Sequence, residues 1–249
     1  QRCALRHAFF AEREGLRVPG LDGIAPRKFE TIGVLGAGTM GAGIAVALSD
    51  AGLPVQVVES SATAAEAGRG RVKATYDRML KSGRIDVAEH IKRMARIEIV
   101  DSFDRLASCD LVIEAVFEDM AVKQDVFRRL GAIAKHGAVL ATNTSYLDVD
   151  PIAAASGRAH DVIGMHFFAP ANIMKLVEII RCAKSDASAL ATGLALAKRL
   201  GKVPVVSGNC DGFVGNRIFA MYRSQVEMAL EDGALPHEVD AAVEAFGFP

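Results

Sequence analysis

Short apolar runs alternate with longer amphipathic stretches over most of this chain. An apolar run at 31–35 is followed at once by glycines, then by an apolar stretch at about 42–50 and a second run at 55–59. Further compact runs cover 96–100, 110–116, 138–142 and 203–206, and helical periodicity marks 64–94, 119–135 and 186–200. Strands that alternate with helices of ten or more residues predict an α/β fold with a doubly wound, mostly parallel sheet.

The two ends of the chain depart from this alternation. Residues 1–14 predict a short helix that ends at Gly15, and 18–28, with two prolines and two glycines, predict a loop. Beyond residue 208 only helical periodicity remains, at about 214–231 and from about 236. We therefore expect a linker helix and loop at 1–28, an α/β domain at 29–207, and at 208–249 the truncated start of an all-α domain. Both ends interrupt a pattern, which suggests a piece of a longer protein.

Two apolar runs near the end of the α/β region each carry one polar residue. His166 lies in the first run and Glu178 in the second, and the loop between them contains Pro170 and Asn172. In a symmetric antiparallel hairpin centred on residue 172, the two side chains face each other on one side of the sheet. A histidine held by a carboxylate is a general base with a fixed tautomer. Taken alone, the pair favours the simpler interpretation of a core histidine satisfied by a nearby acid.

A glycine-rich turn links the first predicted strand to the first helix. Its residues are Gly36, Ala37, Gly38, Thr39, Met40 and Gly41, and Glu59 ends the next strand. This context is that of a Rossmann-type dinucleotide site: the glycines permit a tight turn and a close approach of backbone to pyrophosphate, and the helix N-terminus attracts phosphate. A carboxylate at 59 accepts hydrogen bonds from ribose hydroxyls and repels a 2′-phosphate. NAD is therefore preferred over NADP; FAD and an unliganded turn are the alternatives.

Polar residues follow two of the later strands. Glu118 and Lys123 come after the run at 110–116, and Asn143 and Ser145 come directly after the run at 138–142. Ligands of open α/β sheets bind at the carboxyl ends of the strands, so these side chains are candidates for the cofactor site. The alternatives are a helix N-terminal acid for Glu118, an exposed lysine for Lys123, and a helix N-cap for Ser145.

The predicted helices at 64–94 form the most basic segment of the chain. Its cations are Arg69, Arg71, Lys73, Arg78, Lys81 and Arg84. A solvated helical face is the simpler interpretation of this charge. The alternative is that some of these groups meet the phosphates of an anionic substrate.

Composition narrows the class of partner and compartment. The net charge of −1 argues against nucleic acid or an anionic membrane as the main partner. The four cysteines show no CxxC spacing, which fits reduced thiols in a cytoplasmic protein rather than a disulfide framework or a metal site. No apolar run approaches the length of a membrane span. Neither GxSxG nor HExxH occurs, so hydrolase chemistry has little support.

Five motifs, in this order, resemble the 3-hydroxyacyl-CoA dehydrogenase family over about residues 30–249. They are GAGTMG at 36–41, EAVFE at 114–118, NTS at 143–145, the HFFAP and MKLVEII runs of the hairpin, and GFVGNR at 212–217. The resemblance implies NAD-dependent oxidation of an L-3-hydroxyacyl-CoA to the 3-ketoacyl-CoA in fatty-acid β-oxidation. It implies His166 as catalytic base, Glu178 as its orienting carboxylate, and Ser145 and Asn216 as partners of the reacting oxygen. Glu118, Lys123 and Ser145 would line the nicotinamide and ribose site.

Residues 4–13 resemble the linker of multifunctional fatty-acid oxidation enzymes. That likeness implies a covalently linked enoyl-CoA hydratase domain. The family's helical C-terminal domain implies homodimer contacts, and we expect a cytoplasmic location, or a peroxisomal one in a eukaryote. Two positions depart from the family pattern: Ala169 replaces a common asparagine, and Tyr146 a common serine. Two other functions stay open, a dehydrogenase of another hydroxy acid and a non-catalytic NAD-binding module.

Overall fold

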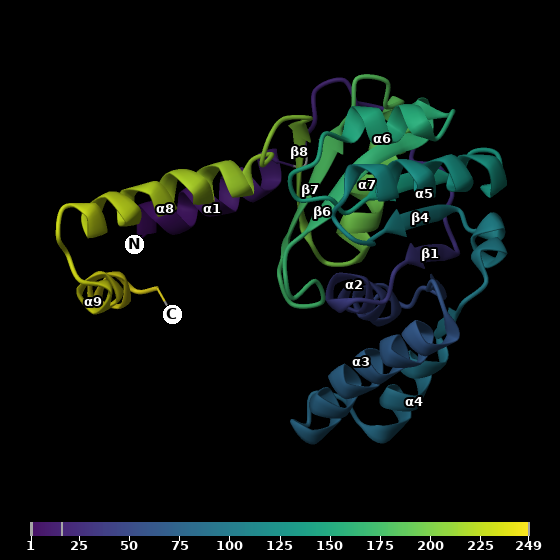
Figure 1. The fold of residues 1–249 in the computed structure, drawn as a ribbon, viewed down its shortest axis with the longest axis horizontal. Coiled ribbons are helices and arrows are strands. Elements are labelled where there is room, and N and C mark those ends of the chain that lie inside the picture. The colour runs from purple at the N-terminus through teal and green to yellow at the C-terminus, as the bar shows by residue number, and fades with distance from the viewer. Residues whose placement is uncertain (1, 16, 249) are drawn as a thin grey trace.

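A computed structural model describes residues 2–15 and 17–248, and its centre is a single eight-stranded sheet (Figure 1). The strand order is β3-β2-β1-β4-β5-β6-β7-β8. Every neighbouring pair is parallel except β6 and β7, which are antiparallel. The strands are β1 (Ile32–Leu35), β2 (Val55–Val58), β3 (Ile97–Val100), β4 (Leu111–Glu114), β5 (Val139–Thr142), β6 (Val162–Phe167), β7 (Leu176–Arg181) and β8 (Val203–Gly208). The predicted doubly wound, mostly parallel sheet with a late hairpin is confirmed.

Each predicted helix is present among the described residues, and one further α-helix was not predicted. They are α1 (Arg2–Glu14), α2 (Thr39–Asp50), α3 (Ala62–Lys81), α4 (Val87–Ala95), α5 (Met120–Ile133), α6 (Val149–Ala155), α7 (Ala187–Arg199), α8 (Gly215–Glu231) and α9 (Pro236–Phe246). Helix α2 begins inside the glycine turn, three residues earlier than predicted. Helix α6 was not predicted, because its seven residues are too few to show a helical period. Residues 1, 16 and 249 of the predicted terminal segments lie outside the described residues.

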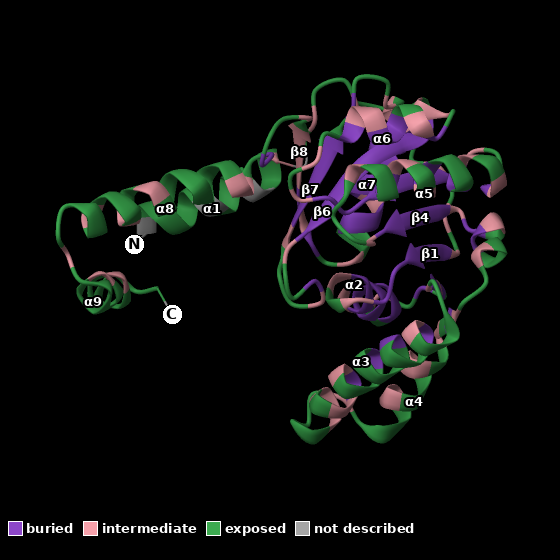
Figure 2. Ribbon diagram, viewed as in Figure 1, coloured by how far each residue is buried: buried purple, intermediate pink, exposed green. Residues whose placement is uncertain are grey.

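Alternate residues of the central strands supply two separate hydrophobic clusters. On β4, Leu111 and Ile113 belong to one cluster, and Val112 belongs to the other. Side chains alternate between the faces of a strand, so the two clusters cover opposite faces of the sheet. Helices α2 and α7 contribute to the first cluster, and α5 and α6 to the second. The buried strands and exposed helix faces are visible in Figure 2.

The hairpin register is the one that its symmetry predicts. In the antiparallel pair of β6 and β7, His166 lies opposite Glu178. Gly164 lies opposite Ile180, and a Cβ at Gly164 would approach Cβ of Ile180 to 2.7 Å. A side chain at residue 164 would thus displace Ile180, two positions along the ladder from the His166–Glu178 pair.

A buried acid just before β6 binds the segment that leads into β1. Arg27 and Arg158 both pair with Asp161, the latter through Nε to Oδ2 at 2.8 Å. The Asp161 side chain is 6% exposed. Burial opposes its ionisation, but the hydrogen bonds from both guanidinium groups outweigh that effect and hold the pKa of Asp161 below its ordinary value of 3.8.

Asp161→Asn is therefore expected to lower the free energy of unfolding at neutral pH by about 3 kcal/mol, because it leaves two half-buried guanidinium groups without their carboxylate. A carboxyl whose folded-state pKa is depressed stabilises the fold above its unfolded-state pKa and loses that effect as pH falls. The difference between the variant and the original chain should thus shrink as the pH falls below the ordinary carboxyl pKa of 3.8. Urea denaturation at several pH values measures it.

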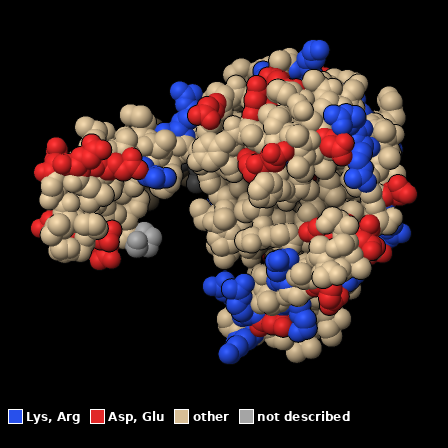
Figure 3. All heavy atoms as spheres, viewed as in Figure 1, with Lys and Arg blue, Asp and Glu red and all other residues tan. Residues whose placement is uncertain are grey.

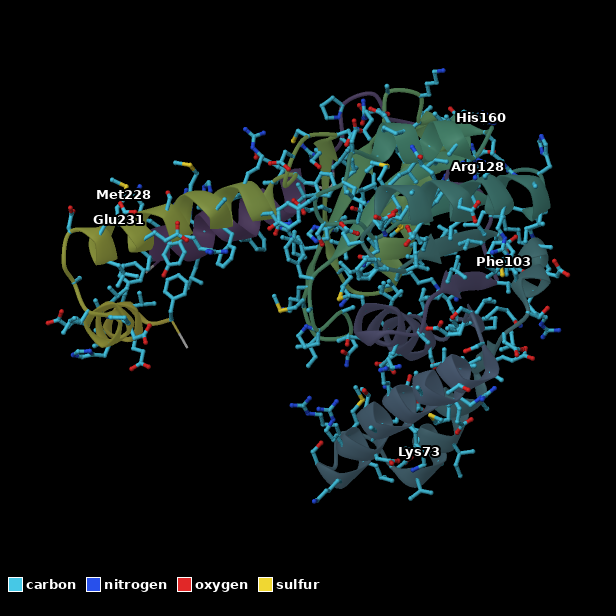
Figure 4. The ribbon with its side chains drawn as sticks, viewed as in Figure 1. Lys73, Phe103, Arg128, His160, Met228 and Glu231 are labelled. Carbon is cyan, nitrogen blue, oxygen red and sulfur yellow. The ribbon has the colours of Figure 1, made fainter. Side chains whose placement is uncertain are left out.

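Asp125→Asn is the matched control for that measurement. Its carboxylate pairs with Arg128 on α5 at 2.9 Å, but both side chains are 62% exposed, and Arg128 projects outward (Figure 4). An exposed pair of this kind contributes about 0.5 kcal/mol or less. Equal losses in the two variants would contradict the role assigned to Asp161.

The helical segment after β8 extends away from the sheet (Figure 1). Among the described residues of α8 and α9 none is buried, and large apolar side chains such as Ile218, Phe219 and Phe246 are more than half exposed. Met228 and Glu231 mark the part of α8 farthest from the sheet (Figure 4). Within residues 2–15 and 17–248, no helix is long and apolar enough to cross a membrane.

Candidate active site

The glycine turn has the geometry that a pyrophosphate requires. Gly36 has φ +97°, a conformation that favours glycine. A Cβ at Gly41 would lie 1.8 Å from the carbonyl oxygen of Gly36, so the helix could not approach the turn with any larger residue. A Cβ at Gly38 would meet nothing within 4 Å, so this position leaves open space at the start of α2. The turn therefore fits the predicted dinucleotide phosphate site.

A cleft of about 720 Å³ runs along this turn at the carboxyl ends of β1, β2 and β4. The cleft is lined by, among others, Gly38, Thr39, Met40, Glu59 and Phe117. The Glu59 carboxylate accepts hydrogen bonds from the backbone N–H groups of Ala37, at 2.5 Å, and Ser60, at 3.1 Å. It therefore lies between the turn and β2, where the prediction placed the ribose.

Sequence reasoning missed several residues that shape this cleft. Phe103, which Figure 4 labels, lies in a short 3-10 helix at Phe103–Ser108 and packs under the guanidinium of Arg129 at 4.0 Å from its ring centroid. Gly68 of α3 packs on the turn itself, since a Cβ there would approach Cβ of Ala37 to 2.5 Å. These contacts join segments 26 or more residues apart in the chain, so no local pattern signals them.

Glu118 organises the loop that follows β5. Its Oε1 accepts hydrogen bonds from Oγ1 of Thr144 at 2.5 Å and from the backbone N–H of Ser145 at 2.8 Å. Burial opposes ionisation of Glu118, but these bonds and the nearby Lys123 outweigh it and lower the pKa of this carboxyl. The helix N-cap is Asp119 rather than Glu118, and the cap of α6 is Asp148 rather than Ser145. Neither residue is therefore a helix N-cap, and a contact of either with a ligand stays a prediction.

Lys123 is fully buried, so the alternative of an exposed lysine is wrong. Its Nζ lies 2.7 Å from Oε1 of Glu114 and 3.3 Å from Oε2 of Glu118. Glu114 is itself fully buried and also accepts a hydrogen bond from Thr142. A buried cation between two carboxylates holds Glu118 in place. A direct contact of Lys123 with the cofactor stays a prediction.

Asn143 connects the ends of two neighbouring strands. Its Oδ1 accepts a hydrogen bond from the backbone N–H of Phe167 at 2.8 Å, and the residue is buried. This bond ties the end of β5 to the end of β6, one residue beyond His166. Asn143 thus aligns the Ser145 loop with the histidine, whatever it contributes to the cofactor.

His166 and Glu178 form a buried hydrogen-bonded pair. Nδ1 of His166 lies 2.7 Å from Oε2 of Glu178, and the two side chains are 5% and 0% exposed. Burial opposes ionisation of Glu178, but the hydrogen bonds from His166 and from the backbone N–H groups of Gly215 and Val214 outweigh it and lower the pKa of Glu178. An ionised Glu178 only accepts, so Nδ1 of His166 is the donor, and in the neutral imidazole the lone pair is then on Nε2.

Asn216 contacts Ser145 next to the His166–Glu178 pair. Nδ2 of Asn216 donates to the backbone carbonyl oxygen of Ser145 at 3.1 Å, and Asn216 directly follows Gly215, which bonds to Glu178. Hydrogen bonds therefore connect Glu118, Ser145 and the start of α8 to the histidine pair. The four predicted catalytic residues converge at one edge of the sheet.

No cluster of three or more His, Cys, Asp or Glu in the described part of the chain could hold a metal ion. The site offers a general base, an amide donor, a hydroxyl and a nucleotide cleft. That combination suits transfer of hydride from an alcohol carbon with removal of the alcohol proton.

Comparisons with known proteins point the same way. Residues 31–210 match the NAD-binding domain of 3-hydroxyacyl-CoA dehydrogenase, and residues 212–249 match its C-terminal domain. The chain is 43% identical over 253 residues to the peroxisomal bifunctional enzyme of Cavia porcellus, covering 100% of this chain and 35% of that protein. It is 36% identical to the peroxisomal fatty acid beta-oxidation multifunctional protein MFP2 of Arabidopsis thaliana, over 98% of this chain and 34% of that one.

Solved structures show the same similarity. The (S)-3-hydroxybutyryl-CoA dehydrogenase PaaH1 of Ralstonia eutropha has a TM-score of 0.86 at 36% identity, with 89% of this chain and 79% of that chain covered. The dehydrogenase part of multifunctional enzyme 1 from C. elegans has a TM-score of 0.75 at 30% identity, with 96% and 57% covered. The chain thus spans about 35% of the length of the curated relatives it matches.

Proposed function

The chain belongs to the 3-hydroxyacyl-CoA dehydrogenase family, whose cofactor is NAD, and we propose that it performs the dehydrogenase step of a multifunctional β-oxidation enzyme. The reaction is oxidation of an L-3-hydroxyacyl-CoA to the 3-ketoacyl-CoA. The observation that carries the proposal is the buried pair of His166 and Glu178, which lies with Ser145 and Asn216 at the same edge of the parallel sheet as the glycine turn.

The chemistry follows from the protonation states of the pair. Bound NAD supplies the hydride acceptor. His166 accepts the proton of the 3-hydroxyl group at Nε2 as the alcohol carbon is oxidised. The positive charge that develops on the imidazole is stabilised by the Glu178 carboxylate 2.7 Å away, which does not itself need to take the proton. Ser145 and Asn216 orient the reacting oxygen.

A second hollow suits the phosphates of the coenzyme A group. Its volume is about 340 Å³, and its walls include Arg71, Thr75 and Arg78 on α3 and Asn172 in the hairpin loop. Figure 3 shows Lys and Arg gathered over the α3 and α4 end of the molecule. Of the two interpretations of this basic segment, phosphate contact is supported for these two arginines; Lys73, which pairs with Asp77 at 2.6 Å, fits the solvated face.

The relatives suggest the setting of the reaction. Several are named bifunctional or multifunctional, and the names of the animal and plant relatives include the word peroxisomal or glyoxysomal. We accordingly propose a peroxisomal location in place of the cytoplasmic one, which has no support among these relatives. A linked enoyl-CoA hydratase domain and homodimer contacts through the helical segment remain part of the proposal, and the exposed apolar faces of α8 and α9 support it.

A substrate panel tests this function in the full-length protein. The L-3-hydroxyacyl-CoA should reduce NAD, followed by NADH absorbance, and its D enantiomer and free 3-hydroxy acids should not. Turnover of the free acids instead would favour a dehydrogenase of another hydroxy acid. NAD binding by calorimetry without turnover of any substrate would favour a non-catalytic module.

A further inference from the structure

The carboxylate of Glu178 connects two elements at once. Oε2 lies 2.7 Å from Nδ1 of His166 on β6, and Oε1 accepts hydrogen bonds from the backbone N–H groups of Val214, at 2.9 Å, and Gly215, at 2.8 Å. Those two N–H groups lie at the start of α8, where backbone donors have no acceptor within the helix. One side chain on β7 therefore links the histidine to the helical segment.

A second contact joins His166 to the start of α8. The ring of Phe168 lies 4.5 Å from the imidazole of His166, measured between centroids. A Cβ at Gly215 would approach Cζ of Phe168 to 2.8 Å, so the start of α8 sits directly against this ring. The helix N-terminus thus contacts the pair through a carboxylate oxygen and through an aromatic ring that packs on the histidine.

We infer that Val214 and Gly215 are positioning residues for the His166–Glu178 pair, and that docking of α8 on the sheet and orientation of the base are coupled. A carboxylate held at one oxygen can rotate about its terminal torsion. Two amide donors on the other oxygen define its plane, and the positive end of the helix favours the anion that holds the Nδ1 proton. If α8 moves from the sheet, both donors leave together. The inference rests on the proposed function for the role of the base, but the coupling is independent of it.

A purely structural role for these contacts is the competing interpretation. In that case Glu178 is simply a cap for α8, and weakening the cap changes stability without affecting the imidazole. The decisive readout is therefore the protonation site of His166, and the decisive variant is Gly215→Ala. Alanine is the better helix former by up to about 1 kcal/mol, so helix propensity alone predicts a gain in stability.

Nitrogen NMR of chains labelled in histidine distinguishes the two interpretations. His166 signals are assigned by their loss in His166→Gln. In the original chain we expect His166 to carry its proton at Nδ1 only. In Gly215→Ala, the Cβ pushes the Phe168 ring and the helix apart, and a mixture of Nδ1 and Nε2 tautomers should result. Gly208→Ala is the matched control, because a Cβ there meets nothing within 4 Å, and it should leave the signals unchanged.

The double variant Phe168→Leu with Gly215→Ala tests the route of the effect. The smaller side chain of leucine makes room for the Cβ at position 215, so the single Nδ1 tautomer of His166 should return. If Gly215→Ala alone fails to fold, the double variant still allows the tautomer to be measured. In the full-length protein, Gly215→Ala should lower kcat roughly tenfold, as expected for a misplaced base, with KM and NAD affinity unchanged.

Three results would overturn the coupling: an Nδ1 tautomer that persists in a folded Gly215→Ala chain, equal effects of Gly208→Ala, or a double variant that is no better than the single one. Failure of the proposed function would be recognised separately. In that case the original full-length protein would not oxidise the acyl-CoA substrate, but the tautomers measured by NMR would still be the predicted ones.

Discussion

His166→Gln is expected to reduce kcat for acyl-CoA-dependent NADH formation by about 10²–10⁴, the range that general-base catalysis contributes. Glutamine cannot accept the hydroxyl proton at neutral pH, but its amide group can still donate to Glu178. The buried carboxylate thus keeps a partner, and the free energy of unfolding should change little. Because neither His166 nor Glu178 lines the nucleotide cleft, the NAD dissociation constant should stay within about twofold, well below the tenfold change that corresponds to about 1.4 kcal/mol.

His136→Gln is the control for this experiment, since His136 is exposed and precedes β5, at the opposite end of that strand from Asn143 and Ser145. It should retain full turnover. A His166→Gln enzyme with turnover near that of the control would show that the pair is a satisfied core histidine and its acid, as the hairpin pattern alone allowed. Measuring kcat and NAD affinity in the same preparation separates loss of the base from loss of the cofactor.

Gly38→Ala and Gly41→Ala should produce opposite defects. The methyl group at residue 38 enters open space at the start of α2, so the thermal midpoint should be unchanged, while NAD binding weakens by tenfold or more, about 1.4 kcal/mol. The methyl group at residue 41 would lie 1.8 Å from the carbonyl oxygen of Gly36. The backbone must then shift, and unfolding should become easier by about 1–3 kcal/mol.

Gly70→Ala in α3 is the matched control for both, because a Cβ there meets nothing within 4 Å and it lies outside the turn. Calorimetric titration with NAD and thermal denaturation give the two readouts. Unimpaired NAD binding by a folded Gly38→Ala chain would contradict the assignment of this space to the pyrophosphate. A loss of stability equal in Gly38→Ala and Gly41→Ala would contradict the division of roles between the two glycines.

The elements of the fold were largely predictable because their signals are local. A buried parallel strand is a compact apolar run, and a glycine turn between a strand and a helix needs no distant partner to be recognised. The pairing of His166 with Glu178 was predictable for the same reason. Only 12 residues separate them, and the centre of the loop determines the register. Seven-residue α6 is the counterexample, since it is shorter than the window that reveals a period.

Lys123 shows where local reasoning fails. A lysine four residues into a predicted helix is ordinarily exposed. Its burial here depends on Glu114, which ends β4, and on Glu118, which lies just before the N-cap of α5. Arg27 and Asp161 are 134 residues apart, and the pair exists because the leading segment passes beside the turn before β6. The domain boundary near residue 208 stays a prediction.

The sequence by itself determined the α/β fold class, the nucleotide turn and the histidine–carboxylate pair, because each depends on a pattern of residues that are close together in the chain. Only the tertiary structure decided what holds that pair. The second oxygen of Glu178 is bound by backbone donors of Val214 and Gly215, 36 and 37 residues away. Every residue but proline carries such a donor, so no side-chain pattern marks these two. Their role arises solely from where α8 begins against the sheet.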